Sequence, residues 1–103
     1  MPLLQPSSVL VQVLNGSGET GQATAASAAL RDVGFAINGT GNAASFSHTD
    51  SVIVYPPGDE QQAETVASYL VGTTSFESNA SIPAGVVDLI LGASYSGVRT
   101  TPS

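Results

Sequence analysis

Three glycines, Gly16, Gly18 and Gly21, follow an apolar run with the G-x-G-x-x-G spacing of a dinucleotide-binding turn. Such a site also needs an acidic residue about 20 positions further on to hold the ribose. Here the second predicted strand ends in the uncharged residues 38–41 (NGTG), and Glu19 inside the turn would repel pyrophosphate. We therefore predict no nucleotide cofactor. The glycines are expected to let a strand reverse into a helix with positive φ, and the N–H groups of that helix end can hold a polar ligand atom.

Catalytic and metal chemistry find little support in the sequence. His48 is the single histidine, and no Gly-x-Ser-x-Gly nucleophile motif accompanies it. A metal site needs several histidines or a carboxylate cluster. Asp59, Glu60 and Glu64 are better explained as acidic residues in the first turns of a helix, where the helix dipole favours negative charge. Cysteine is absent, so there is no thiolate. We predict no catalytic residues and no metal.

The charge balance excludes several partners. The 103 residues have a net charge of -6, and Arg31 and Arg99 are the only cations. Nucleic-acid binding, and docking to anionic lipid, both require clusters of Lys and Arg. No apolar run approaches the roughly 20 residues of a bilayer span. We therefore expect no nucleic-acid partner and no membrane insertion by this segment, with any export signal or anchor lying outside it.

Hydrophobic periodicity predicts the elements that must position the polar residues. Strands are predicted at Val9–Leu14, Phe35–Asn38, Ser51–Tyr55, Thr74–Glu77 and Val86–Leu91, and helices over 22–33 and between Gly58 and Gly72. Residues 1–7 are read as a linker or arm, 8–93 as one domain, 39–50 as a mobile loop and 94–103 as a flexible tail. The order β-α-β-β-α-β-β indicates an α/β (α+β) two-layer sandwich, with two helices on a mixed sheet of four to five strands.

The same periodicity predicts a core. The residues expected to be buried are Val11, Val13, Ala26, Leu30, Phe35, Ile53, Val66, Leu70, Leu89 and Leu91. Phe76, which lies in a predicted strand, is also expected in the core.

Five segments together resemble a known family. They are Val13–Ala23, Ala28–Phe35, Gly41–Phe46, Ser51–Gly58 and Val87–Tyr95. In this order they resemble the LytR C-terminal domain of LytR-CpsA-Psr envelope proteins in actinobacteria such as mycobacteria. The resemblance implies an extracytoplasmic accessory domain that follows a glycopolymer–peptidoglycan transferase domain, or stands alone behind a membrane anchor. It implies no cofactor, and it carries over no catalytic residue.

Two functions remain open under this resemblance. A module that binds cell-wall glycan or peptidoglycan would use neutral hydrogen-bonding side chains and aromatic faces at converging strand ends. The candidate ligand-binding residues are Asn15, Ser17, Asn42, Ser45 and Tyr55. Alternatively, the weak strand Thr74–Glu77 pairs with another envelope protein while the acidic surface attracts a basic partner.

Overall fold

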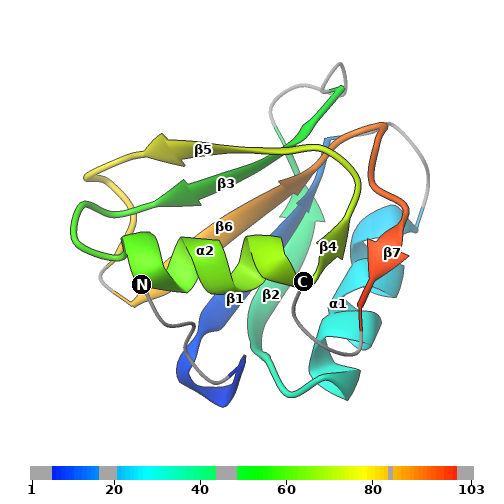
Figure 1. Cartoon of the computed structure of the whole chain (residues 1–103), viewed down its shortest axis with the longest axis horizontal. Helices are drawn as coiled ribbons and strands as arrows, with labels where there is room; N and C mark the ends of the chain where they lie inside the picture. Colours follow the sequence, from blue (N-terminus) through cyan, green and yellow to red (C-terminus); the bar gives the residue numbers. More distant parts are fainter. Residues whose placement is uncertain (1–5, 17–20, 44–48, 84, 100–103) are drawn as a thin grey trace.

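The computed structural model describes residues 6–16, 21–43, 49–83 and 85–99. A short 3-10 helix, η1 (Pro6–Ser8), precedes the main elements. These are β1 (Leu10–Asn15), α1 (Gln22–Asp32), β2 (Ala36–Asn42), β3 (Ser51–Tyr55), α2 (Glu60–Ser68), β4 (Leu70–Val71), β5 (Thr74–Ser78), β6 (Val86–Leu91) and β7 (Gly97–Val98). Both helices pack on a mixed five-stranded sheet (Figure 1), which confirms the predicted fold class.

The sheet contains two β-α-β units, β1-α1-β2 and β3-α2-β5, and the strand β6 lies between them and pairs with both. Its order is β2-β1-β6-β3-β5. Strand β1 is parallel to both β2 and β6, β3 is parallel to β5, and the β3–β6 pair is antiparallel. The carboxyl ends of β1, β2 and β6 therefore lie at one end of the sheet, and those of β3 and β5 lie at the other.

One face of the sheet carries the core. Alternate residues of β1 are buried, as expected for a strand whose side chains point in turn to two faces. The buried strand residues join α1 and α2 in a single apolar cluster. All ten residues predicted to be buried are buried, and Leu30 of α1 is fully so.

The end of α1 follows the sequence prediction, whereas the end of α2 does not. Gly34 has φ +110, and Phe35 N–H donates to Leu30 O at 3.0 Å, which closes α1 with a left-handed residue. The second helix ends at Ser68, earlier than the Gly72 signal predicted, because Leu70 and Val71 pair as β4 with β7.

The first residues of the predicted flexible tail, 94–103, are held to the rest of the domain by backbone hydrogen bonds. Within 94–99, Ser96 N–H donates to Val71 O at 2.9 Å, and Arg99 N–H donates to Tyr69 O at 2.6 Å. These bonds use only the backbone, so the lack of apolar periodicity in this segment did not reveal them. Residues 94–99 are therefore part of the fold, and residues 100–103 lie outside the described part of the chain.

Strand β2 is longer than predicted. Residues 39–42, assigned from sequence to the mobile loop, pair with β1 after a register shift opposite Val11 and Gln12. Glycine offers no side chain to signal a strand, but its backbone pairs with β1 as any other residue would. This extension places Asn42 opposite Asn15 in the register.

Phe76 is the correction with the largest consequence for function. The sequence placed it in the core, but its side chain is 49% exposed. It lies in β5, the edge strand, while α2 packs over the neighbouring strand β3. A half-exposed aromatic side chain in an edge strand is accessible to a partner.

Candidate functional site

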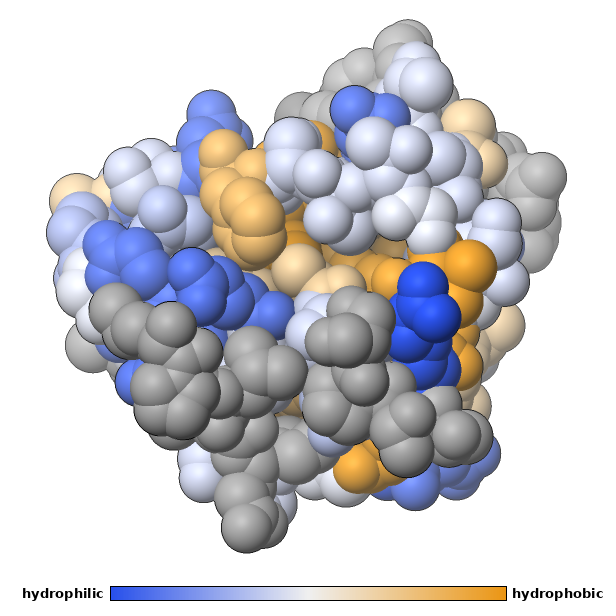
Figure 2. Space-filling model, in the orientation of Figure 1, coloured by the Kyte–Doolittle hydropathy of each residue, from blue (hydrophilic) through white to orange (hydrophobic). Residues whose placement is uncertain are grey.

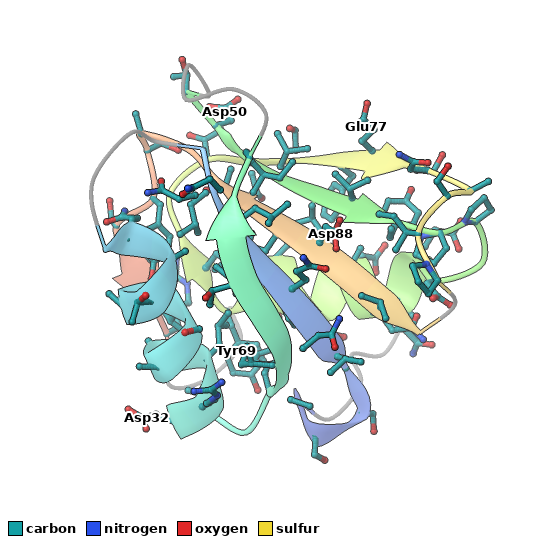
Figure 3. The ribbon with its side chains drawn as sticks, turned by 180° about the vertical axis from the view of Figure 1, so that it is seen from behind. Asp32, Asp50, Tyr69, Glu77 and Asp88 are labelled. Carbon is teal, nitrogen blue, oxygen red and sulfur yellow. The ribbon has the colours of Figure 1, made fainter. Side chains whose placement is uncertain are left out.

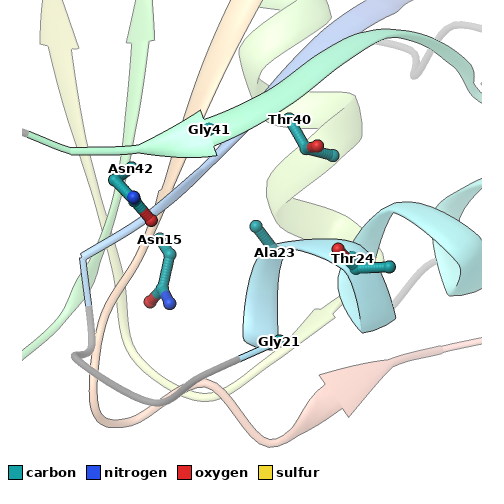
Figure 4. A pocket seen from close by; sticks show the side chains of 7 residues that line it. All are labelled: Asn15, Gly21, Ala23, Thr24, Thr40, Gly41 and Asn42. Atoms are coloured by element: carbon teal, nitrogen blue, oxygen red, sulfur yellow. The ribbon is translucent and has the colours of Figure 1, made fainter.

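A polar cleft lies where β1 and β2 end and α1 begins. Its volume is about 160 Å³, and Figure 4 shows strand residues on one side and the first turn of α1 on the other. The lining residues are Asn15, Gly21, Ala23, Thr24, Thr40, Gly41 and Asn42. We call this the β1–β2 cleft.

The geometry of the cleft follows from the parallel β1–β2 pair. Asn15 and Asn42 are register partners at the last position of each strand, so their amides lie at the same end of the sheet. Asn15 is buried, whereas Asn42 is exposed. Gly16 N–H donates to Leu91 O at 2.9 Å, which fixes the chain as it leaves β1.

The first turn of α1 forms the other wall. Gly21 is the N-cap with φ +80, and its lack of a side chain leaves the first helical N–H groups without a cap from this residue. This confirms the predicted positive φ at Gly21, while Gly18 lies outside the described residues. Two asparagines, two threonines and the first turn of α1 thus line the cleft, and none of the lining residues is charged.

The structure brings together two of the five candidate residues. Asn15 and Asn42 share the β1–β2 cleft, whereas Ser17 and Ser45 lie outside the described residues. Tyr55 is at the opposite end of the sheet, so the prediction that it converges with the others is wrong. The reason is topological: β3 runs antiparallel to β6, which points its carboxyl end away from those of β1 and β2.

Sequence reasoning missed Thr24 and Thr40 as cleft residues. Both are exposed hydroxyls, one in α1 and one in β2. Thr40 had been assigned to a loop, so no strand register was available to place it. Thr24 lies between two alanines in α1, and no sequence pattern singled it out as a ligand-binding residue.

Tyr55 lines a second pocket, also of about 160 Å³. The other lining residues are Glu60 and Glu64 of α2 and Phe76 of β5. Among the described residues, no three His, Asp or Glu side chains gather as metal ligands would. Neither described helix has the length and apolar character of a bilayer span.

We call the sheet face opposite the helices the open face. It holds a carboxyl group with a shifted pKa, that of Asp88. Figure 3 shows this face with α2 behind it and Asp88 near its middle. The register partners of Asp88 are Gln12 on β1 and Val54 on β3, which are uncharged. Burial raises the pKa of the Asp88 carboxyl above its ordinary value of 3.8, because the charged form loses water.

Asp88→Asn is expected to raise the melting temperature near neutral pH. A folded-state pKa above the unfolded one means that the native protein binds the proton more tightly, so stability falls as pH rises through the raised pKa. The substitution removes this loss. Thermal melts of both proteins from about pH 3 to pH 7 should show a difference that grows with pH. An equal difference at every pH would contradict the assignment to Asp88 ionisation.

Comparison with known proteins identifies the family to which this chain belongs. A family model described as LytR cell envelope-related transcriptional attenuator matches residues 8–95. The chain belongs to this family. The LytR C-terminal domain is an accessory domain of cell-envelope proteins, as the sequence resemblance indicated.

A solved structure shares the fold. It is the soluble domain of a conserved hypothetical secreted protein from Mycobacterium marinum. The TM-score between this chain and that structure is 0.79, and the two sequences are 26% identical. The match covers 93% of this chain and 66% of that one, so this chain spans just under two thirds of its neighbour. No protein among the curated sequences matches.

Proposed function

We propose that this LytR C-terminal domain is a non-catalytic, extracytoplasmic module that binds cell-wall glycan in the β1–β2 cleft. The observation that carries the proposal is the uncharged polar lining of that cleft. Amides of Asn15 and Asn42 and hydroxyls of Thr24 and Thr40 surround it. Such groups match the hydroxyl and acetamido groups of neutral sugars, which both donate and accept hydrogen bonds.

The backbone of the cleft suits a sugar ring. Gly21 contributes no side chain to the wall formed by α1, so a ligand can approach the main chain closely there. The N–H groups that begin α1 add donors which do not require a negatively charged ligand. The affinity then rests on a few hydrogen bonds, each worth about 0.5–1.5 kcal/mol net.

This energy predicts weak binding, with dissociation constants from roughly micromolar to millimolar. Weak binding is sufficient if an anchor or neighbouring domain holds the module beside the wall, because tethering raises the effective glycan concentration. The secreted character of the Mycobacterium marinum neighbour supports an extracytoplasmic setting. The family description mentions transcription, but a net charge of -6 and two arginines argue against direct nucleic-acid contact.

The decisive test titrates the domain with soluble, neutral peptidoglycan glycan fragments while backbone amide NMR shifts are recorded. We expect shifts at the ends of β1 and β2 and at the start of α1, with affinity nearly independent of salt because no ion pair forms. Asn42→Ala should weaken binding about two- to tenfold by removing an amide partner.

Asn38→Ala is the matched control for that substitution. Asn38 is an exposed asparagine of the same strand that does not line the β1–β2 cleft, so its loss should leave the affinity unchanged. Binding that disappears at high salt, or an equal effect of the two substitutions, would refute the proposal. So would the absence of any shift at millimolar glycan.

A further inference from the structure

Strand β5 forms a regular, accessible edge of the sheet. It lies last in the strand order, and its residues Ser75 to Ser78 are exposed. Natural edge strands are commonly blocked by proline, lysine or a bulge. The sequence of β5, TSFES, contains neither residue, and its register with β3 is unbroken. The opposite edge strand, β2, has a register shift and two glycines, so β5 is the better template for an added strand.

The hydrogen bonds at the two ends of β5 fix which backbone groups point outward. Ser51 N–H donates to Thr73 O at 3.0 Å, and Asn79 N–H donates to Tyr55 O at 2.8 Å. Residues 73 and 79 thus direct these groups toward β3. Because direction alternates along a strand paired on one side, the N–H and C=O groups of Thr74, Phe76 and Ser78 point to the outer edge.

The side chain of Phe76 lies on the helix face beside this edge. Phe76 is the register partner of Ile53, which belongs to the core on that face. With Tyr55, Glu60 and Glu64 it lines the second pocket. Figure 2 shows an apolar patch above a row of hydrophilic residues over α2, consistent with this arrangement.

The charge of the pocket selects the kind of partner. Both charged residues that line it are glutamates of α2, and no described cation forms an ion pair with them. The two arginines of the chain belong to α1 and to the segment after β7. An aromatic ring beside carboxylates suits a Lys or Arg side chain, which makes a cation–π contact within about 6 Å of the ring and an ion pair with the acid.

We propose that β5 binds an extended basic segment of a partner protein as an added strand. The segment would hydrogen-bond to Thr74, Phe76 and Ser78 and insert a Lys or Arg side chain into the pocket between Phe76 and α2. Adjacent strands lie about 4.8 Å apart, so a side chain of the added strand on the helix face reaches the Phe76 ring. Main-chain bonds supply affinity in this mode, and the pocket supplies specificity. This surface is separate from the β1–β2 cleft.

The test uses the full chain and a capped peptide of about seven residues with alternating Val and Lys, matched by a peptide with Glu in place of Lys. Titration followed by backbone NMR should show shifts at β5 and the first half of α2 with the Lys peptide alone. Ser78→Pro removes an outward N–H and should weaken binding about tenfold, whereas Ser78→Ala should not change it.

Charge variants separate the pocket from general attraction to an acidic domain. Glu64→Gln should weaken Lys-peptide binding roughly two- to fivefold. Glu77→Gln changes the net charge equally, but Glu77 is the register partner of Val54 and lies on the open face, so its effect should be smaller. Equal binding of both peptides, equal effects of Glu64→Gln and Glu77→Gln, or shifts confined to the β1–β2 cleft would each overturn the proposal.

Discussion

Leu30→Ala is expected to lower the free energy of unfolding by about 2–5 kcal/mol, the range for truncating a fully buried leucine. Leu30 has no exposed surface and is among the largest fully buried side chains. It lies in the last part of α1 and belongs to the core cluster formed with the sheet and α2. The truncation removes apolar contacts and leaves a cavity that neighbouring strands cannot fill without bending.

Urea or thermal unfolding followed by circular dichroism measures this loss. Leu14→Ala is the matched control, because Leu14 of β1 lies on the open face and is only half-buried. It should cost clearly less than Leu30→Ala. If the two variants unfold at the same denaturant concentration, α1 does not seal the core as described.

Gly92→Ala is expected to destabilise the domain by about 3 kcal/mol or more, at the upper end of overpacking effects. A Cβ at this position would lie 2.3 Å from both the C and O atoms of Asp50 and 2.8 Å from Ser51 N. These are backbone atoms, so no side-chain rotation relieves the contact. Gly92 N–H also donates to the buried Ser51 Oγ at 3.1 Å, a bond that would shift with the displaced chain.

Gly39→Ala provides the comparison for that result. A Cβ at Gly39 meets no atom within 4 Å, and its φ is not in the left-handed region, so the change should be nearly neutral. Gly92→Ala melting within a few degrees of Gly39→Ala would show that the start of β3 and the end of β6 do not approach as closely as the structure indicates.

The two proposed surfaces predict separable behaviour. The β1–β2 cleft is uncharged and should respond to glycan without salt dependence, whereas the β5 edge is acidic and should respond to basic peptide with salt dependence. Asn42→Ala should affect only the first response and Glu64→Gln only the second. A domain that performs both would hold a partner protein beside the wall.

The sequence by itself determined the elements whose pattern depends on local periodicity. SVIVY and VVDLIL are strands within their predicted limits, and α1 ends at Asp32, two residues before Gly34, the glycine that predicted its end. The core residues were also predictable, because apolar side chains at helical or alternating spacing share one face of an element, and burial of that face is favourable. Asn15 was proposed as the residue directly after a predicted strand, whereas Asn42 was proposed from a predicted loop, and its pairing with Asn15 is known only from the structure.

The tertiary structure alone decided which strand ends meet and which strand forms the edge. Tyr55 was separated from the cleft by the antiparallel pairing of β3 with β6, and no residue of β3 encodes its direction relative to β1. Phe76 became exposed because β5 is last in the order and α2 packs over β3. Strands β4 and β7 exist through backbone pairing between segments distant in sequence. Such contacts depend on the whole arrangement of the chain, which local side-chain patterns do not specify.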